Sequence, residues 1–296
     1  MTKTLSLFSA LTCTFIWGTT FIAQDTGMDE IGPFTFNAVR FFVGFLAILP
    51  FMFLTELKKI KYQLKYGKKT FVKISFLIGL SLFLGSALQQ VALLYTDVAN
   101  AAFFTIFYVP LVPIIIFLFK KKTIHWSVWP AVVLCLIGGY LLTNFQDATI
   151  RLGDTLVILG ALFWSTHIIF TGIIIAKFDL PLTVGAIQTL IVALLSYIIG
   201  SIYEEFIFEN IINEIYSILY AGILSGGFAF VLQIYAQKNI LPAPAAIIFS
   251  LEGVFATIAA WFLLNQILDM NNILGCFFIL CGVLLSQLLP LTKRSI

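Results

Sequence analysis

Apolar runs of about twenty residues, separated by short polar segments, make up most of the chain. A helix needs roughly 20 apolar residues to cross a hydrocarbon layer about 30 Å thick. The pattern therefore predicts an all-α polytopic membrane protein with ten transmembrane helices. The predicted helices are 5–24, 33–53, 72–95, 98–119, 126–143, 155–176, 181–202, 215–236, 243–264 and 273–290.

The composition and the placement of charge support this reading. Hydrophobic residues make up 60% of the chain and charged residues 10%, whereas a soluble domain has roughly 25% charged residues. Ten helices place odd and even connections on opposite sides of the membrane. All of the 17 Lys and Arg residues except Arg40 and Arg151 then lie on the side of the chain ends. The positive-inside rule predicts cytoplasmic N- and C-termini, so the net charge of +3 does not indicate nucleic-acid binding.

The two halves of the chain are weakly similar to each other. One alignment pairs Gln89 with Gln233 and, without a gap, Gly138 with Gly282. A shift that differs by only a few positions pairs Trp17 with Trp164 and Pro33 with Pro181. Each half holds five predicted helices, so the second half must insert with the opposite orientation. Inverted repeats of this kind are frequent in secondary transporters, whose binding sites lie near the membrane midplane between the repeats.

Several segments support a more specific interpretation. The first half contains "FIWGTTFIA", "PFTFNAVRFF" and "NAAFFTIFYVPLVPI", and the second contains "GALFWSTHIIF", "LPAPAAIIFSLEGVFA" and "LGCFFILCGVLL". Over essentially the whole chain these segments resemble the drug/metabolite transporter superfamily, specifically its EamA-type permeases. The resemblance implies two five-helix EamA-like repeats, expected at 1–146 and 147–296, and export or exchange of small metabolites such as amino acids. Where the family has "SLEP", this chain reads "SLEG" at 250–253.

Two charged residues lie well inside predicted helices, away from the helix ends. Glu252 is near the middle of the ninth helix, and Arg40 lies in the second. A charge at the centre of a bilayer costs roughly 2.5 to 3.5 kcal/mol on insertion scales and by default indicates function. Glu252 is therefore a candidate for substrate binding and for proton coupling, with a packing role as the alternative. Arg40 is expected to be peripheral to a central cavity and is a candidate for a structural ion pair with Glu252.

Other polar and aromatic residues in the apolar runs extend the candidate site. Membrane Trp residues usually lie at the two interfaces, so the central Trp17 and Trp164 suggest a cavity wall. His167 lies one turn beyond Trp164. These residues could equally serve helix packing or interhelical hydrogen bonds. The predicted substrate-binding residues are Trp17, Gln89, Tyr108, Trp164, His167, Gln233 and Glu252.

Helix-breaking residues occur at matching places in the two halves. Pro110 and Pro113 interrupt the fourth predicted helix, and Gly253 lies in the corresponding part of the ninth. Such breaks are tolerated where the backbone is buried in protein or lines a cavity. We expect these two helices to bend during gating, although a static kink would also explain the residues.

The sequence favours a secondary transporter of small metabolites that works by alternating access, with efflux of amino acids or related compounds expected. The chain has no phosphate-binding G-x-x-x-x-G-K-[ST] motif, so we do not expect ATP to be the direct energy source. One alternative is an intramembrane enzyme acting on lipid-like substrates, which would need catalytic groups clustered at one depth. Another is a proton-independent facilitator or channel, and a channel would need polar residues repeated along a pore. The polar residues in the apolar runs are instead isolated from one another along the sequence. We expect no enzymatic activity, cofactor, metal or nucleic-acid partner. The expected partners are a metabolite, the lipid bilayer and, as a candidate coupling ion, the proton. Abundant Phe, Ile, Lys and Asn suggest an A+T-rich coding genome and hence a bacterium. The expected location is therefore the bacterial inner (cytoplasmic) membrane.

Overall fold

The computed structural model describes residues 2–65, 67–121, 124–143, 150–263 and 267–288, and every regular element in these ranges is a helix. The first half contains α1 (Lys3–Thr26), α2 (Pro33–Gln63), α3 (Lys68–Ala92), α4 (Val98–Thr105), α5 (Tyr108–Lys120) and α6 (Val128–Leu142). The second half contains α7 (Leu152–Lys177), α8 (Pro181–Tyr203), α9 (Phe208–Asn213), α10 (Ile215–Leu219), the π-helix η1 (Tyr220–Ala229), α11 (Phe230–Ala236), α12 (Pro242–Phe249), α13 (Leu251–Leu263) and α14 (Met270–Leu288).

Ten apolar stretches correspond to the ten predicted spans. Three of them are composite, namely α4–α5, α10–η1–α11 and α12–α13. Among the described residues, nine stretches are long and apolar enough to cross a membrane, and α6 is a shorter apolar helix. The prediction of an all-α polytopic membrane protein with ten transmembrane helices is confirmed.

Most described helix ends lie within four residues of the prediction, with one larger difference at the end of α2 and one helix that was not predicted. Helix α2 continues beyond residue 53 to Gln63 because its polar extension consists largely of Leu, Lys, Glu and Gln, which are good helix formers. The short helix α9 was not predicted at all. Three predicted boundaries lie outside the described residues, namely the helix ends at 264 and 290 and the boundary between the repeats at 146/147.

Two spans are interrupted near their middle, immediately before the predicted helix breakers. Pro110 has no N–H group and cannot bond to the carbonyl of Ile106, four residues earlier. The N–H of Val109 donates to that carbonyl instead, at 2.8 Å, and α4 ends just before this turn. In the second half, α12 and α13 meet at Ser250, whose carbonyl accepts from the N–H of Gly253 at 3.2 Å. The alignment of the two halves pairs the interruption at Ile106 with the one at Ser250.

The span predicted as one α-helix at 215–236 contains the π-helix η1, and the prediction of a continuous α-helix is wrong there. Glycines of η1 face α2. A Cβ atom on Gly222 would lie 2.7 Å from the carbonyl oxygen of Arg40, and one on Gly227 would lie 3.3 Å from that of Gly44. The backbones of η1 and α2 therefore approach each other closely. π-Helical segments are rare, and those that occur are often at functional sites.

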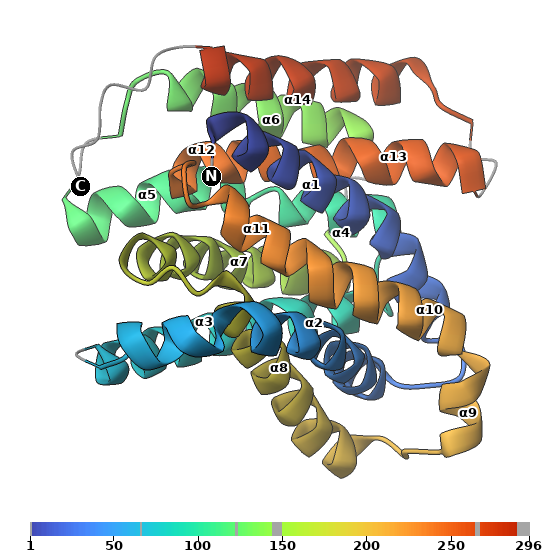
Figure 1. Cartoon of the computed structure of the whole chain (residues 1–296). Coiled ribbons are helices and arrows are strands. Elements are labelled where there is room, and N and C mark those ends of the chain that lie inside the picture. Colours follow the sequence, from blue (N-terminus) through green and yellow to red (C-terminus); the bar gives the residue numbers. More distant parts are fainter. Residues whose placement is uncertain (1, 66, 122–123, 144–149, 264–266, 289–296) are drawn as a thin grey trace.

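The most extensive helix contacts join an element of the first repeat to an element of the second. Helix α2 packs mainly on its counterpart α8, and α6 packs on its counterpart α14. Helix α3 packs on α7, while the counterpart of α3, the stretch α10–η1–α11, packs on α1. In Figure 1, α6 and α14 lie along one edge of the molecule, and α2, α3 and α8 lie along the opposite edge.

Glycines show the same reciprocity at the α6–α14 contact. A Cβ atom on Gly138 would lie 2.6 Å from the carbonyl oxygen of Gly275, and one on Gly275 would lie 2.7 Å from that of Gly138. Small residues allow this close approach, on which helix association within a membrane depends. Gly282, the repeat-related counterpart of Gly138, faces α6 just as closely, since a Cβ atom on it would lie 2.9 Å from the carbonyl oxygen of Ala131.

The N-terminus of helix α2 is capped by a carboxylate from the end of α8. The backbone N–H groups of Phe34 and Thr35 donate to the two carboxylate oxygens of Glu204, at 2.9 and 2.7 Å. The hydroxyl of Thr35 also donates to Glu204, at 2.6 Å. The first N–H groups of a helix have no partner within the helix, and an anion there also interacts favourably with the helix dipole.

Helix α8 begins on a carboxylate from α2 in the same way. The N–H groups of Leu182 and Thr183 donate to the two carboxylate oxygens of Glu56, at 3.0 and 2.8 Å. The hydroxyl of Thr183 donates to Glu56 at 2.6 Å. The alignment that pairs Pro33 with Pro181 also pairs each group of one cap with its counterpart in the other. The two caps are therefore repeat-related and lie at opposite ends of the α2–α8 pair.

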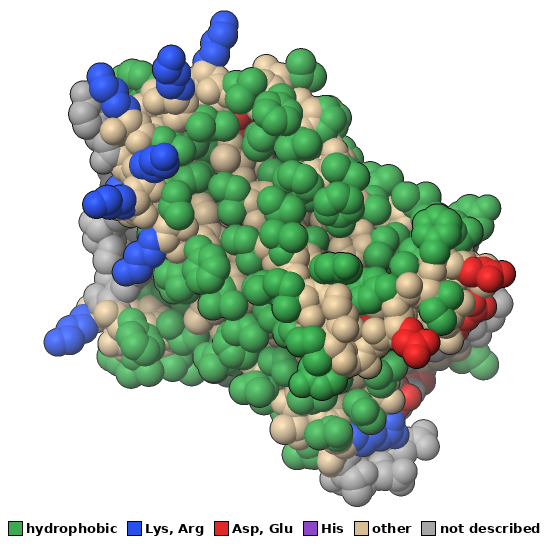
Figure 2. All heavy atoms as spheres, turned by 90° about the horizontal axis from the view of Figure 1, so that it is seen from below, with side chains coloured by type: hydrophobic (Ala, Val, Ile, Leu, Met, Phe, Trp, Pro, Cys, Tyr) green, Lys and Arg blue, Asp and Glu red, His purple; other side chains and the backbone are tan. Residues whose placement is uncertain are grey.

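The surface carries an apolar band between two charged ends. Figure 2 shows most of the Lys and Arg side chains at one end of this face, Asp and Glu at the other, and hydrophobic side chains between them. At the lysine-rich end, Asp179 binds Lys238 and lies 3.4 Å from Lys59. The hydrogen bond from Lys238, with the charge of both lysines, lowers the pKa of Asp179. This distribution fits a protein embedded in a lipid bilayer.

Candidate functional site

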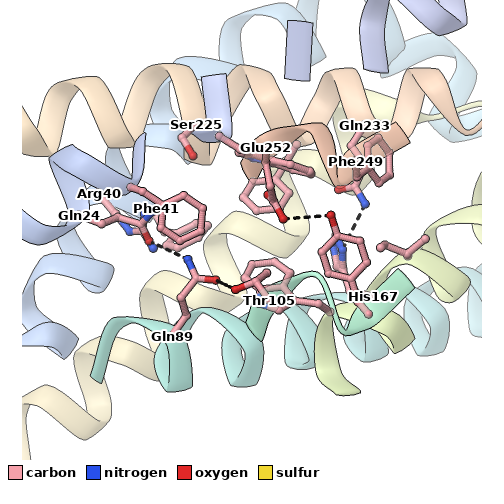
Figure 3. Close-up of a pocket in the computed structure, with 16 residues that line it drawn as sticks. Gln24, Arg40, Phe41, Gln89, Thr105, His167, Ser225, Gln233, Phe249 and Glu252 are labelled. Atoms are coloured by element: carbon pink, nitrogen blue, oxygen red, sulfur yellow. Dashed lines mark hydrogen bonds between the residues drawn. The ribbon is translucent and has the colours of Figure 1, made fainter. Parts of the chain in front are cut away.

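A cavity of about 50 Å³ lies at the centre of the molecule, between the interrupted spans (Figure 3). Its walls come from both halves of the chain. All seven residues predicted to bind substrate line it: Trp17, Gln89, Tyr108, Trp164, His167, Gln233 and Glu252. The structure thus brings the predicted residues together, while their roles stay predictions.

The buried carboxylate of Glu252 is held by a tyrosine from the other half of the chain. The hydroxyl of Tyr108 donates to Oε1 of Glu252 at 2.9 Å. Tyr108 is the first residue of α5, and Glu252 lies in the first turn of α13, where the helix dipole favours a negative charge. The two residues occupy equivalent positions in the two repeats, so the repeats meet at this hydrogen bond.

Arg40 lies elsewhere than expected. It is 3% exposed and lines the central cavity, so the expectation of a peripheral position is wrong. Its Nε donates to Oδ1 of Asn37 at 2.8 Å, and the guanidinium carbon lies 5.3 Å from the ring centre of Phe36 and 4.8 Å from that of Phe41. Among the described residues, the ion pairs do not include one between Arg40 and Glu252.

A glutamine cluster forms one end of the cavity, at the left of Figure 3. Nε2 of Gln89 donates to Oε1 of Gln24 at 3.3 Å, and the hydroxyl of Thr105 donates to Oε1 of Gln89 at 3.4 Å. Nε2 of Gln90 donates to the backbone carbonyl of Gln24 at 2.8 Å. The cluster connects α1, α3 and α4.

A second cluster, built around His167, forms the other end. Nε2 of His167 is 3.0 Å from Oε1 of Gln188, and Nδ1 is 3.4 Å from Nε2 of Gln233. Because an amide oxygen only accepts and an amide nitrogen only donates, this arrangement fits a neutral imidazole with its proton on Nε2. Gln89 and Gln233, related by the repeat, therefore lie at opposite ends of the cavity.

Aromatic rings close the side of the cavity. Phe230 stacks on Trp164 with 6.2 Å between ring centres and an interplanar angle of 7°, and lies 5.1 Å from Trp17. Phe249 meets Trp17 edge-on at 5.6 Å. The indole N–H groups of both tryptophans are buried and have no hydrogen-bond partner among the described residues.

The sequence reasoning missed several residues that complete the cavity. Gln24 and Thr105 lie near the ends of helical segments, where polar residues are common and attract no notice. Phe230 and Phe249 are two among 31 phenylalanines and carry no signal of their own. Gln24 could have been noticed because it is a polar residue in register with Trp17, two turns earlier on α1.

The cavity is small for a metabolite. Its volume has room for a few water molecules, whereas sites for small organic ligands measure roughly 300 to 1,000 Å³. A wider cleft of about 870 Å³ lies at the acidic end, and its lining reaches Ile106 and Gly253, beside the two helix interruptions. Within the described part of the chain, no group of three His, Cys, Asp or Glu side chains could hold a metal ion.

Broken helices around a central cavity in a helical membrane protein are typical of membrane transporters. The comparisons with known proteins agree. A model of the EamA-like transporter family matches residues 4–144 and 151–288. The chain belongs to the EamA-like transporter family and is a multi-pass membrane transporter, as the resemblance implied.

Similar proteins are named as transporters without a stated substrate. An uncharacterized transporter from Archaeoglobus fulgidus is 32% identical over 92% of this chain and 82% of its own length. The uncharacterized transporter YoaV from Bacillus subtilis is 24% identical over 95% of this chain and 96% of its own length. A crystal structure of another protein shares the fold, with a TM-score of 0.78 and 17% identity, over 97% of this chain and 98% of that one.

Proposed function

We propose that this protein is a secondary transporter that exports small metabolites, with amino acids or related compounds as the expected cargo, by alternating access across a bacterial cytoplasmic membrane. The observation that carries the proposal is the convergence of seven polar and aromatic residues from both repeats on one cavity between two interrupted spans. The lysine-rich end faces the cytoplasm, and the repeats divide near residues 146 and 147.

The interrupted spans supply the moving parts of this proposal. Tyr108 and Glu252 lie directly after the interruptions at Ile106 and Ser250. Bending there would change the separation of the two side chains and thereby the size of the cavity. Pro110 and Pro113 act in this scheme by removing backbone hydrogen-bond donors, and Gly253 acts by the greater backbone freedom of a residue without a Cβ atom. The wide cleft at the acidic end is the route to the outside.

Glu252 is the residue to which we assign proton coupling. Among the described residues, its carboxyl group has one hydrogen-bond donor, the hydroxyl of Tyr108. The carboxyl group can exchange a proton when the cavity opens to water. The alternatives are a facilitator that works without protons and an intramembrane enzyme for lipid-like substrates. The family membership and the names of the relatives favour a transporter over an enzyme.

Counterflow in proteoliposomes tests the proposal. Labelled amino acids and other metabolites are offered to the wild type, to Glu252→Gln and to the exposed control Glu205→Gln, with and without a pH gradient. We expect saturable uptake that follows the gradient in the wild type and in Glu205→Gln but not in Glu252→Gln. Uptake by all three proteins that ignores the gradient would establish a proton-independent facilitator. No uptake of any compound by folded protein would favour the enzyme.

A further inference from the structure

Arg40 is a buried cation without an ion-pair partner among the residues that the structure describes. Burying a charge is costly unless the charge is paired. The described residues offer Arg40 one hydrogen bond, from Nε to Asn37, and two aromatic faces, those of Phe36 and Phe41. Cation–π contacts stabilise a guanidinium group only in part. The group that would complete this environment is a negatively charged acceptor.

The guanidinium group is held with its free end available. Nδ2 of Asn37 donates to the backbone carbonyl of Ser86 at 3.3 Å, and this bond leaves Oδ1 of Asn37 to accept from Nε of Arg40. The two Nη groups make no hydrogen bond to any residue in the described part of the chain. Because Arg40 lines the central cavity, a ligand in the cavity can reach them. A planar guanidinium fork binds a carboxylate through two parallel hydrogen bonds.

The surroundings of Arg40 keep it in place. The π-helix η1 lies against the same turn of α2, so close that a Cβ atom on Gly222 would be 2.7 Å from the carbonyl oxygen of Arg40. Ser225 of η1 lines the cavity together with Arg40. The repeat-related position in the second half holds Gln188, which is bound to His167. The two repeats therefore differ here, with a fixed positive charge on one side only.

Unpaired hydrogen-bond donors around the cavity outnumber unpaired acceptors. In the described part of the chain, the buried indole N–H groups of Trp17 and Trp164 and the two Nη groups of Arg40 have no hydrogen-bond partner. The acceptors on carbonyl and carboxylate groups that the described residues leave unpaired are Oε1 of Gln233 and Oε2 of Glu252. The carboxyl group of Glu252 already accepts a hydrogen bond, and its presence disfavours a ligand with two negative charges. One guanidinium group and one carboxyl group suit a ligand whose acidic end carries a single negative charge.

We infer that Arg40 binds the carboxylate of a small monocarboxylate or zwitterionic metabolite in the central cavity, so that the transporter selects for an acid group. This inference rests on the proposed transport function and adds a residue and a required ligand group to it. The aromatic wall of Trp17, Trp164 and Phe230 then faces the remainder of the ligand.

Two matched sets of compounds test the inference on wild-type protein in proteoliposomes. Each set separates the acid group from the amine: L-alanine, L-alaninamide, ethylamine and propanoate, and L-phenylalanine, L-phenylalaninamide, 2-phenylethylamine and 3-phenylpropanoate. Counterflow measures which compounds are carried, and thermal unfolding of the purified protein measures which compounds bind. We expect the amino acid of at least one set to be carried and to stabilise the protein, with its amide and amine inactive in both measurements.

Variants then assign this preference to Arg40. We expect Arg40→Gln to weaken binding of the carried amino acid roughly 10- to 100-fold, the range expected for losing a hydrogen bond to a charged group. Arg40→Lys keeps the charge without the planar fork and should lie between Arg40→Gln and the wild type. The control is Lys61→Gln, since Lys61 is an exposed basic residue near the end of α2 that lines neither the central cavity nor the wide cleft.

The outcomes separate the two proposals. Transport of an amide or amine at least as effective as that of its amino acid would overturn the role of Arg40 and leave the transporter standing. Unchanged affinity in a folded Arg40→Gln protein would do the same. If folded wild-type protein carries none of the eight compounds, the proposed transport of amino acids fails, and the inference fails with it.

Discussion

At the scale of single residues, the centre of the molecule is organised by the hydrogen bond between Tyr108 and Glu252. Either residue alone would be a poor choice for an apolar interior, because an unpaired hydroxyl or carboxyl group loses its bonds to water without replacement. Together they satisfy one another and join the two repeats. The same reasoning makes Arg40 conspicuous, since it lines the same cavity and forms no ion pair with any acidic residue that the structure describes.

Removing the tyrosine hydroxyl tests what this bond contributes. We expect Tyr108→Phe to lower the free energy of unfolding by about 1 kcal/mol, because Glu252 loses its donor in a buried environment. Unfolding of the purified protein in a denaturing detergent titration measures the change. Tyr62→Phe is the control, since Tyr62 is 84% exposed.

A double-mutant cycle with Glu252→Gln isolates the pair from the other contacts of each residue. The cycle should give a stabilising interaction free energy between Tyr108 and Glu252 of about 1 kcal/mol or less, as for a single interhelical hydrogen bond. If Tyr108→Phe and Tyr62→Phe unfold alike, the bond contributes nothing measurable, and Glu252 must be satisfied in another way.

At the scale of helices, the α2–α8 pair is fastened at both ends by reciprocal caps. Glu204 receives the first N–H groups of α2, and Glu56 receives those of α8. Both carboxylates also accept from a threonine hydroxyl of the helix that they cap. Because the caps lie at opposite ends, they fasten α2 to α8 at both ends, whereas the bending proposed for this transporter is in the interrupted spans α4–α5 and α12–α13.

Neutralising each cap tests this fastening. We expect Glu56→Gln and Glu204→Gln each to lower the free energy of unfolding by about 1 kcal/mol, since an amide makes weaker hydrogen bonds to helix N–H groups than a carboxylate does. The two effects should add, because residues 34 and 56 of one helix are roughly 30 Å apart. Glu205→Gln, exposed and next to a cap, is the control. Equal unfolding of all three variants would show that the carboxylates do not stabilise the helix starts.

At the scale of the whole molecule, charge separates the two ends and an apolar surface lies between them (Figure 2). The lysine-rich end includes Lys61 near the end of α2, and the acidic end includes Glu209 of α9. Since basic residues are retained on the cytoplasmic side during insertion, we expect the lysine-rich end to face the cytoplasm.

Cysteine labelling in intact bacteria tests the orientation. We expect Glu209→Cys to react with a membrane-impermeant maleimide in whole cells, and Lys61→Cys to react only after the cells are opened. Both positions are exposed, whereas the native Cys13 and Cys135 are buried and Cys276 and Cys281 are partly buried. The wild type supplies the background. The reverse pattern would place the lysine-rich end outside and overturn the proposed direction of the cavity openings.

Length and composition of the apolar runs were sufficient to predict ten helices, because crossing a bilayer requires a number of apolar residues that can be counted locally. The same local information located the odd polar residues, and their scarcity made them informative: all seven candidates line one cavity. The positions of the helix interruptions were approximate, since proline acts on a carbonyl one turn earlier. The π-helix η1 left no comparable signal in the sequence. Its residues are as apolar as those of the neighbouring α-helical spans, and only the pattern of backbone hydrogen bonds differs.

Partners of these residues were decided only by the packed structure. Tyr108 and Glu252 are 144 positions apart, and the contact between them depends on the angles at which two interrupted helices meet. Arg40 was expected beside Glu252 because opposite charges attract, yet its depth and facing direction on α2 place Asn37 and two rings around it instead. The partners of Glu56 and Glu204 are likewise set by packing, because each carboxylate caps a helix on the other side of the α2–α8 contact. Apolar length is a property of one segment, whereas the partner of a buried polar group is a property of the surfaces that meet.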